Sequence, residues 1–228
     1  MRRVVPSGGF AYPGSMSLVD VYRACGLNSE PSAILWDLDG TITDTESQWV
    51  ANTKKIIEAR GGSWLKSDEE ALHGSSTEDH AEHMEFVLRR DGGDVADGMV
   101  LFEEVAVLMA EQVYSDPDLM PGAIELLDAF ADAGMPQALV TATPMNLAGP
   151  AIESLPRDYF SARVTGDQVQ RGKPDPEPYA TAISRLGVNP AECLAFEDSI
   201  PGETSARGAG ARVVNVLKLE LAALAGLL

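Results

Sequence analysis

Short apolar runs recur along the chain, and longer helical patterns separate them. The runs cover residues 33–36, 137–141, 162–165, 193–196 and 212–216. Each is too short for a helix, and such runs between turn signals are typical of buried strands. Helical patterns follow over residues 123–133, 177–186 and 199–208. This alternation predicts an α/β fold: a Rossmann-like parallel sheet core with helices on both faces.

Residues 46–118 interrupt the alternation. They carry helical patterns over 47–60, 76–90 and 99–114 and no convincing strand. We therefore expect a small helical cap domain inserted after the first strand, with hinges near residues 43–46 and 115–122. The α/β core would comprise residues 16–45 and 119–228, with the apolar tail 217–228 packed as a helix. We expect residues 1–15 to form a disordered extension.

Composition narrows the class of protein. The chain has 228 residues, 45% of them hydrophobic, which is enough for a sizeable core plus an accessory domain. Its net charge of −18 repels nucleic acid and anionic membranes, so we expect neither as a partner. Cys25 and Cys193 lie far apart and form no CxxC pattern, which argues against a disulfide scaffold. We expect a monomer in the cytoplasm.

Candidate chemistry begins where the first predicted strand ends. Asp37 and Asp39 stand two residues apart there, and Gly40 allows a sharp turn. In parallel α/β sheets ligands bind beyond the carboxyl ends of the strands. Two carboxylates at such a place are costly unless a cation joins them. Taken alone, the motif is equally consistent with an ordinary Asp-Gly turn.

Three further motifs have the same ambiguity. Thr141 and Ala142 follow the second strand, where a hydroxyl and free N–H groups make either an anion pocket or a helix cap. Lys173 stands between Gly and Pro in a loop and is either a positioned cation or surface decoration. Glu197 and Asp198 follow the fourth strand, and carboxylates at a strand end suit Mg²⁺.

In this order the four motifs resemble those of the haloacid dehalogenase-like hydrolase superfamily. The shared patterns are Asp-x-Asp-Gly-Thr, a Thr that ends the second strand, Gly-Lys-Pro and Glu-Asp-Ser-x-x-Gly, over residues 32–216. The forms found here are similar to the branch of helical-cap phosphatases and β-phosphoglucomutases. Ala142 departs from the pattern, because an Asn is common at that position.

The resemblance implies a role for each matched residue. Asp37 would be the nucleophile that forms an aspartyl-phosphate, and Asp39 the general acid and base. Thr141, the N–H of Ala142 and Lys173 would hold the phosphoryl oxygens. The implied activity is that of a phosphatase acting on small phosphomonoesters such as sugar phosphates, so the expected partner is a small phosphorylated metabolite.

The resemblance also implies Mg²⁺ as the cofactor. Asp37, the main-chain carbonyl of Asp39 and Asp198 would hold the ion, with Glu197 in the same cluster. Phosphate cannot approach so many carboxylates without compensation, and Mg²⁺ together with Lys173 supplies it.

The cap is expected to select the substrate through a loop over residues 72–79. Its candidate specificity residues are Gly74, Ser75, Ser76, Thr77 and Glu78. His80 and His83 follow at helical spacing, and we interpret them as a solvated helix face rather than a metal site.

Two alternatives remain open. The first is a hexose-phosphate phosphomutase of the β-phosphoglucomutase type. Those enzymes carry a His in the first cap helix and an Arg in the cap loop, whereas Trp49 and Thr77 match those positions here.

The second alternative is a catalytically silent phosphate-binding protein of the same fold. Such proteins tend to lose a key position, and here every one is present. Dehalogenase and phosphonate-cleaving relatives generally lack the second Asp.

Overall fold

The computed structural model describes residues 17–72 and 75–228, so the expected N-terminal extension lies outside them. Five parallel strands form one sheet in the order β3-β2-β1-β4-β5. They are β1 (Ala33–Trp36), β2 (Gln137–Val140), β3 (Ala162–Val164), β4 (Cys193–Glu197) and β5 (Arg212–Asn215). All five predicted strands are confirmed. Strands β1, β2 and β4 are buried along their whole length, which explains why they read as unbroken apolar runs.

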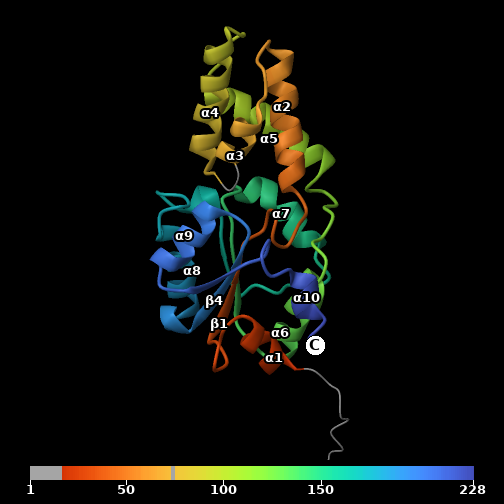
Figure 1. Ribbon diagram of the computed structural model, residues 1–228, viewed down its shortest axis with the longest axis vertical. Coiled ribbons are helices and arrows are strands. Elements are labelled where there is room, and N and C mark those ends of the chain that lie inside the picture. The colour runs from red at the N-terminus through yellow and green to blue at the C-terminus, as the bar shows by residue number, and fades with distance from the viewer. Residues whose placement is uncertain (1–16, 73–74) are drawn as a thin grey trace, which may run out of the picture.

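Helices cover both faces of the sheet (Figure 1). One face packs against α1 (Leu18–Ala24), α6 (Ala123–Asp132), α7 (Met145–Ser154) and α10 (Leu221–Ala225). The other packs against α8 (Glu177–Leu186) and α9 (Ile200–Gly208). Short 3₁₀ turns occupy Gly166–Gln168 and Pro190–Glu192. The predicted tail helix is shorter than expected, because only Leu221–Ala225 is helical.

Four helices form a separate group at the carboxyl end of the sheet (Figure 1). They are α2 (Glu46–Ala59), α3 (Lys66–Leu72), α4 (Thr77–Asp91) and α5 (Gly98–Gln112). We call this group the cap. Its interior is apolar and includes Ile57, Met84, Leu101 and Met109. Helix α3 was not predicted, because its run of acidic residues has no apolar repeat.

The two segments that join the cap to the sheet lie side by side. Thr43 and Leu119 form an antiparallel bridge. The N–H of Asp44 donates to the carbonyl of Asp118 at 2.8 Å, and the N–H of Met120 donates to the carbonyl of Ile42 at 2.9 Å. The cap therefore leaves and re-enters the core at one place. Among the helices in the described part of the chain, none combines the length and apolar character needed to cross a membrane.

Candidate active site

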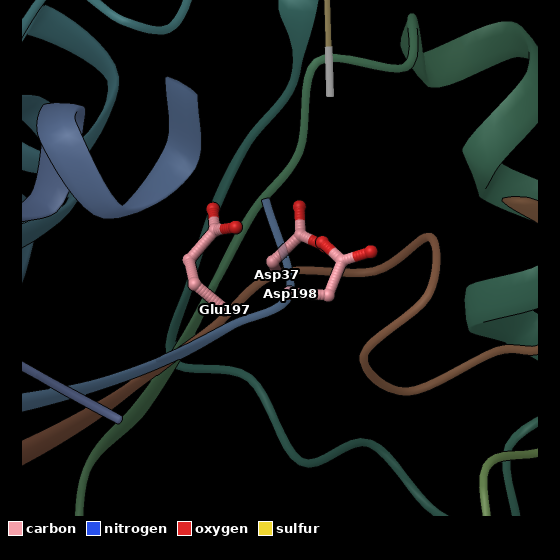
Figure 2. Close-up of side chains that lie close together, drawn as sticks. All are labelled: Asp37, Glu197 and Asp198. Atoms are coloured by element: carbon pink, nitrogen blue, oxygen red, sulfur yellow. The ribbon is translucent and has the colours of Figure 1, made fainter. Parts of the chain in front are cut away.

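Three carboxylates meet where two neighbouring strands end. Asp37 follows β1, Glu197 is the last residue of β4, and Asp198 follows it. One oxygen atom from each lies within 4.8 Å of the other two, and all three residues are buried (Figure 2). Gly40 makes this approach possible: its φ is +78°, and a Cβ there would lie 2.2 Å from Asp198 Oδ2.

Lys173 is buried against two of these carboxylates. Its Nζ lies 2.6 Å from Asp37 Oδ1 and 2.5 Å from Glu197 Oε1, and the residue is only 3% exposed. The Tyr179 hydroxyl donates to the same Glu197 oxygen at 2.7 Å. Of the two interpretations that the sequence left open, the lysine is therefore a positioned cation and not surface decoration.

Charge in this cluster is unbalanced. Among the described residues, three carboxylates and one ammonium group make up this cluster. Burial raises the pKa of the Asp37 carboxyl well above its usual value, Lys173 lowers it, and the charges of Glu197 and Asp198 raise it again. Burial alone would lower the pKa of Lys173, but Asp37 and Glu197 raise it above its usual value, so the ammonium stays charged. The cluster can accommodate a divalent cation.

Asp39 lies apart from this cluster, inside a ring of hydroxyl groups. Thr45 and Tyr114 each donate to Oδ1 at 2.5 Å. Thr143 donates to Oδ2 at 2.6 Å, and Thr141 reaches the same oxygen at 3.4 Å. Hydrogen bonds to a carboxylate fix its orientation and are stronger than those between neutral groups.

Tyr114 connects this ring to the cap. It follows α5, is fully buried, and accepts a hydrogen bond from Trp49 Nε1 of α2 at 2.9 Å. Burial and the neighbouring Asp39 raise the pKa of its phenol well above the usual value, which keeps the group protonated and able to donate. The sequence analysis did not single out Tyr114, because an aromatic residue at the end of an apolar helix is usually core.

The candidate phosphate residues lie beside the carboxylates. Thr141 is buried directly after β2, and its Oγ1 accepts from the N–H of Thr143 at 3.0 Å. Ala142 lines the same cleft. The structure thus brings together Asp37, Asp39, Thr141, Ala142, Lys173 and Asp198, which all line one cleft. Glu197 lies behind Lys173, beneath that surface.

The opposite wall of the cleft comes from the cap. Ser75, Ser76 and Thr77 line it, whereas Glu78 is exposed and does not. Gly74 lies outside the described residues. The proposed loop over 72–79 is too long, because Leu72 ends α3 and Thr77 begins α4. Ser76 is the N-cap of α4, so the helix begins earlier than a loop over 72–79 would allow.

The expectation of a solvated histidine face is wrong for His80. It is 7% exposed, lines the cleft, and its Nε2 lies 2.9 Å from Thr53 Oγ1. Burial and the nearby His83 lower its pKa to about 4. His83 is partly buried, with Nε2 3.2 Å from Asp68 Oδ1. The two rings therefore have different surroundings despite their helical spacing.

The chain resembles known proteins in sequence and in fold. A family model for haloacid dehalogenase-like hydrolases matches residues 31–210. Protein CbbY of Rhodobacter capsulatus is 32% identical over 81% of this chain and 85% of its own length. Hexitol phosphatase A of Escherichia coli is 31% identical over 80% of this chain and 81% of its own. The structure of CbbY from Rhodobacter sphaeroides with xylulose-(1,5)bisphosphate superposes with a TM-score of 0.64, at 29% identity, over 80% of this chain and 84% of that one.

Proposed function

Since this chain belongs to the haloacid dehalogenase-like hydrolases and is a phosphoric monoester hydrolase, we propose that it hydrolyses small phosphomonoesters, including sugar phosphates, through an aspartyl-phosphate. The observation that carries the proposal is the placement of Asp37 and Asp39. One carboxylate is paired with a buried ammonium, the other is held by hydroxyl groups, and both face one cleft. The two groups thus have separate surroundings suited to separate roles.

The proposed reaction has two steps. An Asp37 carboxylate oxygen forms a bond to phosphorus while the bond from phosphorus to the substrate oxygen breaks, and Asp39 gives its proton to the departing alcohol. Asp39 then removes a proton from a water molecule, whose oxygen attacks the phosphorus and releases phosphate and free Asp37. Thr141 and the N–H of Ala142 orient the phosphoryl oxygens, and Lys173 neutralises charge beside Asp37.

The carboxylate cluster fits Mg²⁺. Three buried carboxylates provide the hard oxygen ligands that this ion prefers. Asp37, Asp198 and the main-chain carbonyl of Asp39 would hold it, with Glu197 supporting the cluster from behind. When bound, the ion would stabilise negative charge on the phosphoryl oxygens.

We also propose that the cap, over residues 46–118, moves as a unit above the cleft. Closure would shield the aspartyl-phosphate from stray water. The paired linkers at Thr43 and Leu119 are the proposed hinge. The cytoplasm remains the proposed location, which suits the free thiols of Cys25 and Cys193.

The decisive experiment replaces the nucleophile. We expect Asp37→Asn to reduce the hydrolysis of p-nitrophenyl phosphate by at least a thousandfold, because an amide is a poor nucleophile. Asp132→Asn, at an exposed carboxylate far from the cleft, is the matched control and should keep wild-type turnover. EDTA should abolish phosphate release and Mg²⁺ should restore it. An Asp37→Asn variant with near wild-type turnover, or activity that survives metal removal, would contradict the mechanism.

A further inference from the structure

We propose that the cap wall of the cleft recognises an uncharged, hydroxyl-bearing leaving group and discriminates against substrates with a second anionic group. The inference rests on the proposed phosphatase activity and specifies its substrate class. It comes from the chemistry of the cap side chains that face Asp37 and Asp39 across the cleft.

Two aromatic rings form part of this wall. Trp49 of α2 and Phe102 of α5 are stacked, with centroids 5.6 Å apart and an angle of 18° between their planes. Both residues line the cleft. Such surfaces pack against the apolar CH faces of sugars and polyols, and they give an anion no compensation for lost hydration.

His80 adds a polar group to this wall without adding charge. Its ring lies 5.3 Å from the Phe102 ring and 5.7 Å from that of Trp49, measured between centroids. The Thr53 hydroxyl holds its Nε2 at 2.9 Å. Because burial lowers its pKa to about 4, the imidazole is neutral near pH 7. A neutral imidazole pairs with a hydroxyl group, and it cannot neutralise a carboxylate or phosphate.

The beginning of α4 also borders the cleft, and a helix N-terminus normally attracts anions. Here the side chains of Ser76 and Asp79 lie at that N-terminus. The Ser76 hydroxyl accepts from the N–H of Asp79 at 3.1 Å and donates to the Asp79 carboxylate at 2.8 Å. Glu78 and Asp79 add negative charge in the first turn. Neither carboxylate lines the cleft, but both place negative charge in the first turn of the helix that borders it.

The described residues that line the cleft supply little positive charge. Among the described lining residues the one cation is Lys173, and its Nζ is bound to Asp37 and Glu197. A substrate phosphate can use the proposed metal and Lys173, but a second anion on the same molecule would have to lie against the cap.

This substrate class separates the chain from one of its relatives. The CbbY structure contains xylulose-(1,5)bisphosphate, which carries two phosphates. Hexitol phosphatase A is named for phosphates of uncharged polyols. The cap wall described here suits the second kind of leaving group.

The test compares pairs of substrates that differ in one group. Each pair has an uncharged member and an anionic one: 2-hydroxyethyl phosphate with phosphoglycolate, and fructose 6-phosphate with fructose 1,6-bisphosphate. At pH 7 with Mg²⁺ we expect kcat/KM at least tenfold higher for the uncharged member. An equal or higher value for the anionic members would overturn the inference and leave the phosphatase proposal standing. If p-nitrophenyl phosphate is not hydrolysed either, both proposals fail.

A second test introduces a positive charge into the cap wall of the cleft. Val50 lines the cleft from α2, whereas its neighbour Ala51 is exposed and does not line it. We expect Val50→Arg to raise kcat/KM for the anionic member relative to its uncharged partner at least tenfold. Ala51→Arg adds the same charge outside the cleft and should change this ratio less than twofold. Equal ratios in the two variants would show that the wall does not select by charge.

Discussion

The two walls of the cleft are built on different principles. The sheet wall holds its charged groups in fixed positions: Lys173 and its carboxylate partners are all buried and joined by short hydrogen bonds. Apart from Glu46, the described cap residues that line the cleft are stacked rings, aliphatic side chains, hydroxyl groups and a neutral histidine. Charge is thus concentrated where phosphoryl chemistry would occur, and it is low where the rest of a substrate would lie.

This difference predicts which amino-acid substitutions each wall can tolerate. A buried charge cluster loses much of its stability when one member is removed, because the remaining charges lack partners. Trp49 and Phe102 are also part of the hydrophobic core, so replacing them by smaller residues should cost stability, whereas a partly buried wall position such as Val50 should accept changes more readily. The sheet wall should therefore be sensitive to single changes of charge, and the cap wall should be adaptable at its partly buried positions.

The largest expected effect tests the sheet wall. Lys173→Met removes the ammonium between Asp37 and Glu197, and we expect the free energy of unfolding to fall by about 3–5 kcal/mol in the presence of EDTA. Lys54→Met, at an exposed lysine of α2, should cost less than about 0.5 kcal/mol. Urea unfolding measures both. A loss below about 1 kcal/mol for Lys173→Met would show that the cluster is not held together by charge.

An intermediate effect is expected where the two walls meet. Tyr114→Phe removes the phenol that donates to Asp39 and accepts from Trp49. Hydrogen bonds to charged groups contribute about 1.5–3 kcal/mol, so we expect kcat to fall about tenfold or more with little change in KM. Tyr159→Phe is the matched control, since its hydroxyl donates to Asp128 away from the cleft. Equal kcat values for both variants would exclude a positioning role for Tyr114.

The smallest effect concerns acid stability of the cap. Folding lowers the pKa of His80 from 6.5 to about 4, so between these pH values the unfolded chain binds a proton at His80 and the folded chain does not. The free energy of unfolding is therefore unaffected by His80 above pH 6.5, and it decreases as the pH falls from 6.5 to 4. At pH 5.5 the loss is about 1.4 kcal/mol. His80→Gln should remove it, which urea unfolding of both proteins at pH 7.5 and 5.5 would detect. Parallel losses in the two proteins would contradict this assignment.

The core of the molecule could be predicted from the sequence because its signals are local. A strand buried on both faces reads as a short apolar run, so β1 and β4 were located together with the acidic residues that end them. The parallel sheet then dictates that Asp37, Glu197 and Asp198 converge. Lys173 was identified from its neighbours Gly and Pro, but its two carboxylate partners became visible only in three dimensions.

The cap was less predictable because burial there depends on contacts between helices. His80 and His83 have the same polar character and helical spacing, yet only His80 packs against Trp49 and Phe102. Tyr114 resembled an ordinary core residue, and its role depends on the position of Asp39, which lies 75 residues earlier in the chain. The pattern of apolar and polar residues carries no information about a contact between residues so far apart in the sequence.

The paired linkers at Thr43 and Leu119 have a consequence for how this chain can evolve. Since the two linkers lie side by side, the cap is equivalent to a single long loop inserted at one point of the core. The entropy of closing a loop grows slowly, by about 0.6 kcal/mol for each doubling of length. The cap can therefore be lengthened, trimmed or exchanged with little effect on the order of strands beneath it. Substrate range and phosphoryl chemistry can thus diversify at different rates within one gene.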